Sequence, residues 1–457
     1  MAEGTAAPPQ VRDVSLREAF WVWFRIGWLG FGGPAGQIAL MHRELVERRR
    51  WISEARFLHA LNYCMLLPGP EAQQLSVYIG WLMHRTLGGL IAGVLFVLPG
   101  ALVLVLLSAL YVHYGNTVGL AALFFGLKAA VLALVIEAVL RIGRRALKTR
   151  FHLVVAAAAF IAIFLLAVPF PWIVLAAAFI GIAVQRWMPA WSPLAKAEDA
   201  AVDANCLVDR LLADPKRVVS PSWRRAARVT AVCLLLWFAP LLVLQLWLGN
   251  DHVIVREGLF FSQTAVVTFG GAYAVLAYVA QRAVEQFAWL QPAEMLDGLA
   301  LAETTPGPLI MVLQFVGFVA AYRHAGVLDP WTAAMLGAAV TTWVTFVPCF
   351  LFVFVGAPYV EALRRHAATR AALSCITAAV VGVVLNLSAW FALHSLFGEV
   401  RSIEWLVFRF DLPIWQSLRP AALLLSSLAL LAVFRLKLGL GWVLGGSAAL
   451  GVLHGLW

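Results

Sequence analysis

Charged residues are scarce in this chain of 457 residues: Asp, Glu, Lys and Arg together make up 13%, while 62% of the residues are hydrophobic. A soluble globular domain is about a quarter charged and about half apolar. The shortage of charge therefore excludes an ordinary soluble domain. It predicts an all-α polytopic membrane protein whose apolar stretches cross a lipid bilayer many times.

Signatures of catalysis and of metal binding are also missing. No Walker motif, CxxC pair, haem-ligand pattern, catalytic dyad or His/Cys/Asp cluster with ligand spacing is present. The sequence therefore predicts no enzyme activity, no catalytic residue, no cofactor and no metal site. Small buried side chains are the simplest interpretation of the five scattered cysteines, which are Cys64, Cys206, Cys233, Cys349 and Cys375.

Two further absences concern targeting and partners. Residues 1–19 have no apolar core, so no cleavable signal peptide is expected. The net charge of +10 does not indicate nucleic-acid binding, because the basic residues gather in loops between apolar stretches, which is typical of cytoplasmic anchoring.

What the chain does contain is one pattern that occurs twice. Its parts lie at positions 31–34, 51 and 67–70, and they return 238 residues later at 269–272, 289 and 305–308. Three landmarks in one register indicate an internal duplication. The paired segments are Phe31-Gly32-Gly33-Pro34 with Phe269-Gly270-Gly271-Ala272, Trp51 with Trp289, and Leu67-Pro68-Gly69-Pro70 with Thr305-Pro306-Gly307-Pro308.

Each glycine and proline cluster interrupts an apolar stretch of helix length. Proline removes a backbone donor and restricts the residue before it, so we expect a broken helix at each cluster. Matching breaks in two halves are typical of the binding site of a secondary transporter. Later segments also align, with offsets of 249 (Val97-Leu98-Pro99 and Phe346-Val347-Pro348) and 270 (Trp172 and Gly181 with Trp442 and Gly451).

Loop charges predict the topology. Loops 41–56, 84–86 and 141–150 are basic and are expected to be cytoplasmic, whereas 113–116 has no lysine or arginine and is expected outside. Consecutive basic loops share a side only if each broken stretch enters and leaves by one face. We therefore predict re-entrant hairpins, whose arms of about 12 residues reach about 18 Å into the bilayer.

The second half has the opposite charge pattern. Loop 281–294 has the single basic residue Arg282, whereas 361–370 has Arg364, Arg365 and Arg370. This predicts two homologous halves in inverted topology. The expected division is a polar N-terminal tail (1–17), a first repeat (18–187), a linker (188–228), a connecting transmembrane helix (229–249) and an inverted second repeat (258–457), with the tail and the linker cytoplasmic.

Several of these motifs together resemble the chromate ion transporter family, in its long-chain, two-domain bacterial form. They are Gly30-Phe31-Gly32-Gly33-Pro34-Ala35-Gly36-Gln37, Arg50-Trp51, Leu67-Pro68-Gly69-Pro70 with Tyr78-Ile79-Gly80, Ala302-Glu303-Thr304-Thr305-Pro306-Gly307-Pro308 and Gln314-Phe315-Val316-Gly317. The resemblance covers nearly the whole chain outside the termini and the 188–228 linker.

The resemblance implies efflux of chromate across the bacterial inner membrane, with chromate resistance as the outcome. The second half departs from the motif, because Ala272 replaces the proline, so its break is expected to bend less and the two half-sites to differ. A sulfate or other oxyanion carrier and an anion channel are the alternatives. The expected partners are the anion and the lipid bilayer, with a homodimer as one possible assembly.

The helix breaks suit a tetrahedral dianion, which is costly to place in hydrocarbon. A helix that restarts after a break presents free N–H groups and a positive dipole end. The alternative is that the glycines only allow close helix packing. The candidate substrate-binding residues are Arg25, Phe31, Gly32, Gly33, Pro34, Gln37, Pro68, Gly69, Pro70, Gln73, Gln74, Lys128, Phe269, Gly270, Gly271, Thr304, Thr305, Pro306, Gly307, Pro308 and Gln314.

Four charged residues are further candidates, and two of them, Arg25 and Glu71, have two interpretations. Arg25 either neutralises the dianion or extends to the membrane surface. Glu71 and Glu303 are proton-coupling candidates, although Glu71 also suits the first turn of a helix as a dipole partner. Lys128 is a candidate second anion contact.

Overall fold

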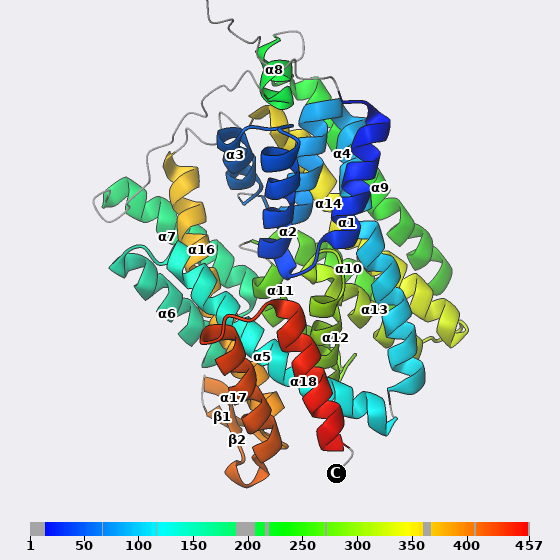
Figure 1. Cartoon of the computed structure of the whole chain (residues 1–457), viewed down its shortest axis with the longest axis vertical. Coiled ribbons are helices and arrows are strands. Elements are labelled where there is room, and N and C mark those ends of the chain that lie inside the picture. Colours follow the sequence, from blue (N-terminus) through cyan, green and yellow to red (C-terminus); the bar gives the residue numbers. More distant parts are fainter. Residues whose placement is uncertain are drawn as a thin grey trace, which may run out of the picture.

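The computed structural model describes residues 14–65, 67–115, 117–188, 206–214, 219–269, 272–359, 367–405 and 408–455. The chain is almost entirely helical (Figure 1). Within these ranges six helices are long and apolar enough to cross a membrane, which confirms the prediction of a polytopic helical membrane protein. They are α4 (Glu71–Tyr114), α5 (Val118–Ala146), α7 (Phe170–Trp187), α9 (Trp223–Leu248), α14 (Pro330–Gly356) and α16 (Ala367–Leu396).

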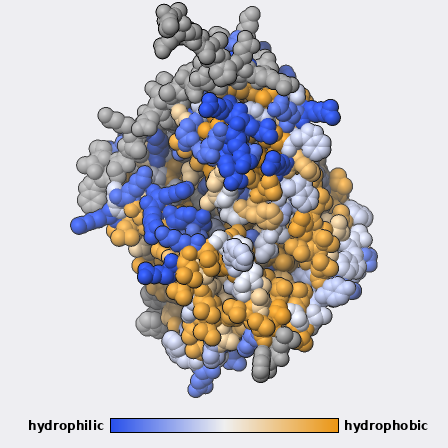
Figure 2. All heavy atoms as spheres, viewed as in Figure 1, coloured by the Kyte–Doolittle hydropathy of each residue, from blue (hydrophilic) through white to orange (hydrophobic). Residues whose placement is uncertain are grey.

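Large apolar side chains lie on the outer surface of these helices. Trp172 and Phe179 of α7 are 65% and 71% exposed, and Leu246 of α9 is 79% exposed. Figure 2 shows hydrophobic atoms over much of the visible lower face and hydrophilic atoms gathered above it. An apolar surface of this extent is suited to contact with lipid chains.

The duplication extends to the order and boundaries of the elements. The first repeat also contains α1 (Leu16–Leu29), α2 (Gly33–His42), the π-helix η1 (Arg43–Arg48), α3 (Glu54–Cys64) and α6 (Arg150–Phe164). Their counterparts are α10 (Val253–Val267), α11 (Ala272–Ala280), the π-helix η4 (Gln281–Gln286), α12 (Pro292–Thr304) and α17 (Pro420–Phe434). The 3₁₀ turn η5 (Leu309–Met311) and α13 (Val312–Arg323) match the start of α4, and α18 (Leu440–Gly455) matches α7.

Backbone details repeat with the same offsets. The π-helices begin 238 residues apart, at Arg43 and Gln281. Arg50 and its counterpart Ala288 both have φ of 51°. A π-helical turn is rare and a positive φ is unusual for these residue types, so their recurrence in one register is a structural signature of the duplication.

Close glycine contacts fold each repeat back on itself. α4 is interrupted at His84 and Arg85, where the backbone leaves the helical region. A Cβ atom on Gly80 would overlap the carbonyl oxygen of Gly88, so the segments before and after the interruption lie against each other. In the second repeat Gly317 and Gly337 make a similar contact between α13 and α14. Glycine at these positions is required for close approach.

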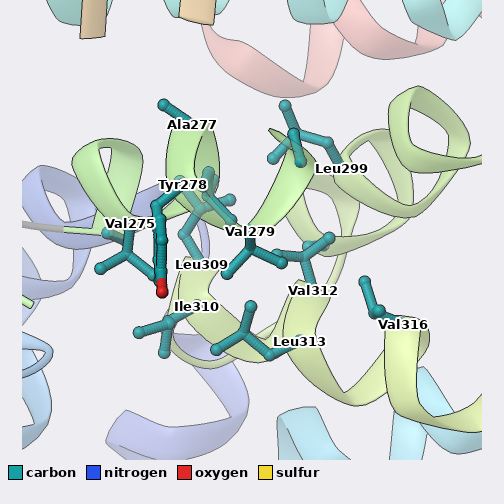
Figure 3. Close-up of a cluster of buried hydrophobic side chains, with 14 of the residues drawn as sticks. Val275, Ala277, Tyr278, Val279, Leu299, Leu309, Ile310, Val312, Leu313 and Val316 are labelled. Atoms are coloured by element: carbon teal, nitrogen blue, oxygen red, sulfur yellow. The ribbon is translucent and has the colours of Figure 1, made fainter. Parts of the chain in front are cut away.

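The two halves share a large apolar core. Figure 3 shows a part of it, where Tyr278 and Val279 of α11 lie against Ile310 and Val312 of the segment after the second Pro-Gly-Pro turn. α9 packs beside this core, and its Trp237 Nε1 donates to Ser262 Oγ of α10 (3.0 Å). α9 begins at Trp223, six residues before the predicted connecting helix. The prediction followed the apolar residues and therefore left out the first turns of α9, which contain Arg224, Arg225 and Arg228.

Besides α9, the linker helix α8 and a β-hairpin in the second repeat have no counterpart among the described elements of the other repeat. α8 (Leu207–Ala213) belongs to the linker and docks on the first repeat: the Val208 N–H donates to Trp51 O (2.9 Å), and Arg56 Nε donates to Asp209 Oδ1 (2.9 Å). The strands β1 (Val400–Trp405) and β2 (Phe408–Pro413) form an antiparallel hairpin between α16 and α17. This hairpin is a departure from the all-α prediction, and it replaces the short connection formed by residues 147–149 in the first repeat.

Candidate functional site

Helices end at the predicted glycine and proline clusters. α1 ends at Leu29, and Gly32 and Gly33 adopt positive φ (85° and 63°) before α2 continues. Gly69 and Gly307 occupy the same positions in the two Pro-Gly-Pro turns and have φ of 123° and 95°, which glycine adopts without steric cost. Gly270 and Gly271 lie outside the described residues. The described breaks thus have the backbone form that their composition predicts.

The Pro-Gly-Pro turn of each repeat is bound by the other repeat. The Gly69 N–H donates to Thr268 O (2.7 Å), and the Gly307 N–H donates to Gly30 O (3.0 Å). Positions 30 and 268 are equivalent, as are 69 and 307. The two hydrogen bonds are therefore one contact made twice, as at an interface with two-fold symmetry. The described residues of the breaks therefore meet at the boundary between the halves.

The long helices α4 and α14 support these turns reciprocally. A Cβ atom on Gly100 of α4 would overlap Pro306 O and lie 3.1 Å from Gly307 Cα. At the equivalent position of α14, the Cys349 Sγ lies 2.9 Å from where a Cβ of Gly69 would be. Each turn is thus held against the residue that follows the helix proline of the opposite repeat, Pro99 or Pro348.

Three buried amide side chains lie beside the breaks of the first repeat. Gln37 Nε2 donates to Gly30 O (3.2 Å) and also to Gly307 O, so it bridges the two repeats. Gln74 Nε2 donates to Pro68 O (2.6 Å). Gln73 is fully buried, and neither polar atom of its amide has a hydrogen-bond partner among the described residues. The equivalent positions of the second repeat hold Val275, Val312 and Met311.

A cavity of 490 Å³ lies beside the break of the first repeat. Glu303 is 4% exposed at its wall, and Tyr273 O–H donates to Glu303 Oε1 (2.7 Å). Arg141 Nε lies 3.8 Å from Glu137 Oε1, and none of the described acidic residues forms an ion pair with Lys437. The polar part of the lining is formed by Gly32, Gly36, Glu137, Arg141, Tyr273, Glu303 and Lys437.

Two cationic side chains and two carboxyl groups therefore meet in one cavity. The start of α2 at Gly33 adds the positive end of a helix of 10 residues at the same place. One carboxyl group, Glu303, accepts a hydrogen bond from a tyrosine, and the other lies near Arg141. Such a lining suits a small anion and a carboxyl group that gains and loses a proton.

A family model described as a chromate transporter matches residues 17–182 and 256–452, one match in each half. The chain belongs to the chromate transporter family. It is 28% identical over 441 residues to a chromate transport protein of Cupriavidus metallidurans, which covers 96% of this chain and 93% of that protein. It is 34% identical over 385 residues to a chromate transport protein of Pseudomonas aeruginosa, covering 83% and 81% of the two chains. No solved structure matches.

In this chromate transporter family member, the predicted charged residues lie in different places. Glu303 lines the cavity, whereas Glu71 is half-buried as the first residue of α4. Arg25 is exposed on the outer surface of α1 beside Phe24 and does not line the cavity. This position favours the membrane-surface interpretation of Arg25.

Lys128 is engaged in an ion pair. Its Nζ lies 3.0 Å from Asp297 Oδ1 on α12, and Tyr111 O–H donates to Asp297 Oδ2 (3.0 Å). The charge of Lys128 is therefore already matched by a neighbouring carboxylate. This ion pair connects α5 to α12, the helix that precedes the second Pro-Gly-Pro turn.

The remaining candidates are mostly part of the interface between the halves. Pro70, Pro306, Gly307, Pro308, Thr305 and Gln314 are buried, and Pro34, Pro68 and Thr304 are half-buried. The hydroxyls of Thr304 and Thr305 donate to carbonyls of their own helix, Leu301 O and Ala302 O. Phe269 packs against the large core, whereas Phe31 is 45% exposed. Among the described residues, no group of His, Cys, Asp or Glu is placed to hold a metal ion.

Sequence reasoning did not assign Arg141, Lys437 and Tyr273 to a site. Arg141 opens a basic loop, and its charge was used only to orient that loop. Lys437 lies in the turn between α17 and α18, far from any motif. A comparison of the two repeats could have indicated these two cations. Lys437 is equivalent to Ala167, and Arg141 is equivalent to Trp390, so each is charged in one repeat only.

Proposed function

We propose that this protein is a secondary transporter that exports chromate across the bacterial inner membrane, and that chromate resistance follows from this export. The observation that supports this function most directly is the cavity beside the first helix break, which is lined by Arg141, Lys437 and Glu303. The names of the relatives in Cupriavidus and Pseudomonas supply the anion. Chromate is a tetrahedral dianion, so two cations and a helix start offer it charge-assisted contacts.

We propose that the two repeats, 18–187 and 258–457, are inverted with respect to each other in the membrane, with the tail and the linker cytoplasmic. The reciprocal bonds of Gly69 and Gly307 support a two-fold relation between the halves. The single helix α9 between them supports the inversion, because one extra crossing reverses the orientation of every later segment. In Figure 1 the arms α1–α3 lie above α11 and α12.

The broken stretches are proposed to be re-entrant. α1, α3, α10 and α12 have 14, 11, 15 and 13 residues, each short of the about 20 residues that a crossing requires. The Pro-Gly-Pro turns that follow α3 and α12 lie against α14 and α4 of the opposite repeats. Irregular backbone at membrane depth is tolerated when protein encloses it in this way.

Coupling to protons is proposed to use Glu303. A charged Glu303 repels a dianion in the same cavity, whereas a protonated Glu303 does not, and Tyr273 holds the carboxyl group in a fixed position. Because of this repulsion the anion and the proton on Glu303 occupy the cavity together, so transport of the anion is coupled to movement of a proton in the same direction. Sulfate has the same shape and charge, so charge alone does not separate the two anions at this cavity.

The test is uptake of chromate into inside-out membrane vesicles, with the pH gradient varied at fixed membrane potential and sulfate added as a competitor. Vesicles without the protein are the control. Accumulation that depends on the pH gradient is expected. Uptake that follows only the membrane potential, at rates that do not saturate, would indicate a channel, and uptake of sulfate alone would replace chromate as the substrate.

A further inference from the structure

A second cavity occupies the position in the other repeat that corresponds to the first. The cavity described above, here called the α5 cavity, is walled by α5 and the turn between α17 and α18. The second, here called the α16 cavity, has a volume of 360 Å³ and is walled by α16 and the end of α6. Glu137 and Arg141 of α5 correspond to Asn386 and Trp390 of α16, which line the second cavity.

A second pair of elements also corresponds. Val433 and Lys437 in the α5 cavity are equivalent to Ile163 and Ala167 in the α16 cavity, 270 residues earlier. Ala167 and Lys437 also share a positive φ, 49° and 52°, so the two turns have the same backbone form. Four equivalent pairs show that the wall formed by α5 and the end of α17 recurs in the other repeat as the wall formed by α16 and the end of α6, whereas Tyr273 and Glu303 of the α5 cavity have no equivalents in the described lining of the α16 cavity.

The charges of the two cavities differ. The α5 cavity has two cations, Arg141 and Lys437, at its wall. The described lining of the α16 cavity has no lysine or arginine, and its acidic members are Glu285 and Asp411. These cations offset the two carboxyl groups of the same cavity, Glu137 and Glu303, whereas the carboxylates in the described lining of the α16 cavity face no lysine or arginine. A dianion is therefore favoured in the α5 cavity relative to the α16 cavity.

The hairpin β1–β2 adds to the difference. Ser402, Phe410 and Asp411 of the hairpin cover the α16 cavity. The first repeat has residues 147–149 in place of the hairpin, so the α5 cavity has no such cover. The α5 cavity therefore lacks the cover that the hairpin gives to the α16 cavity. The acidic residue Asp411 lies on this hairpin, which only the second repeat has.

We propose that these two cavities are the opposite mouths of one anion path: Arg141 and Lys437 capture a tetrahedral dianion in the α5 cavity, and the α16 cavity releases it. The inference rests on the proposed function, and it adds to that function the capture residues and the origin of direction. Arg144, Arg145 and Lys148 come directly after Arg141, which places the capture mouth on the side of the basic loops.

Capture is tested by the half-saturating chromate concentration in proteoliposomes of known orientation. Arg141→Gln and Lys437→Gln are each expected to raise it about tenfold, the loss expected for one charge-assisted contact, about 1.4 kcal/mol. Arg141→Lys is expected to recover part of the loss. Arg435→Gln is the matched control, since Arg435 lies in the same turn and does not line the cavity. Unchanged half-saturation in both glutamine variants overturns the proposal.

Direction is tested by moving the cations to the other mouth. The double variant Ala167→Lys with Trp390→Arg, made in the background of Arg141→Gln and Lys437→Gln, is expected to raise the ratio of chromate uptake from the α16 side to that from the α5 side. An unchanged ratio contradicts the assignment of the mouths. Wild-type protein that moves no chromate would instead refute the proposed function.

A chemical variant covers the case in which these substitutions lower the amount of folded protein. Lys437 is exposed, so Lys437→Cys is open to thiol reagents, whereas all five native cysteines are buried. A reagent with a positive charge is expected to restore low half-saturation, and one with a negative charge is expected to raise it further. Equal effects of the two reagents would refute a role for the charge.

Discussion

Gly100 offers a direct test of how the two repeats are joined. In a helix interior alanine is ordinarily more stable than glycine by about 0.5–1 kcal/mol. At Gly100, however, a Cβ atom would overlap Pro306 O and lie 3.1 Å from Gly307 Cα, and both neighbours are backbone atoms that cannot turn aside. Overpacking of this kind costs about 1–3 kcal/mol. Gly100→Ala is therefore expected to destabilise the protein by about 1–2 kcal/mol, a change opposite in sign to the helix preference.

The same substitution at Gly445 supplies the control. Gly445 lies inside α18, and a Cβ atom there would meet nothing within 4 Å. Thermal unfolding of the detergent-purified variants, followed by tryptophan fluorescence, is expected to show a lower Tm for Gly100→Ala and an equal or higher Tm for Gly445→Ala. Transport by Gly100→Ala is expected to fall, because the Gly307–Gly30 hydrogen bond is displaced. Equal stabilisation by both substitutions would refute the close contact between α4 and the second Pro-Gly-Pro turn.

Three further predictions concern the turns and the charges. Pro68→Ala with Pro70→Ala is expected to let the helix continue and to abolish resistance while the protein stays in the membrane; full resistance on chromate plates would reduce the turn to a packing element. Glu303→Gln is expected to keep chromate binding and to lose the dependence of uptake on the pH gradient, and an unchanged dependence would remove Glu303 from the coupling. Lys128→Met is expected to cost about 3–5 kcal/mol in unfolding free energy by stranding Asp297, and Asp297→Asn in the same chain is expected to recover much of it. If Lys128→Met instead raises half-saturation with no loss of stability, Lys128 is an anion contact.

The helix breaks could be predicted because they arise from local backbone chemistry. A proline or a positive-φ glycine ends a helix wherever the segment is placed, so Gly32, Gly69 and Gly307 marked the breaks without knowledge of the fold. The same holds for the duplication, which is a property of spacing. The sequence also indicated that the half-sites differ, through the replacement of proline by Ala272.

The site itself depended on contacts between distant segments. Gln37 reaches Gly307 across 270 positions, and Lys437 reaches the cavity from the turn between α17 and α18. The spacing of Arg25 from Gly30 set its height along α1 but not the face of the helix on which it lies. Lys128 is predicted as an anion contact from its position within an apolar stretch, whereas its partner Asp297 comes from the second repeat. Side-chain partners in a duplicated protein are set by how the copies meet, and single-helix spacing does not contain that information.

The exchanged hydrogen bonds of Gly69 and Gly307 also bear on what a single repeat can do alone. Each repeat carries a Pro-Gly-Pro donor and the carbonyl acceptor for the turn of its partner, yet it cannot satisfy its own donor. A chain of half this length would be an incomplete unit until it met a second copy. On the inverted arrangement proposed above, that second copy would lie the other way up. The half-length chain would then have to insert into the membrane in both orientations. Fusion of two copies through α9 removes this requirement, since one insertion event delivers both orientations in equal number.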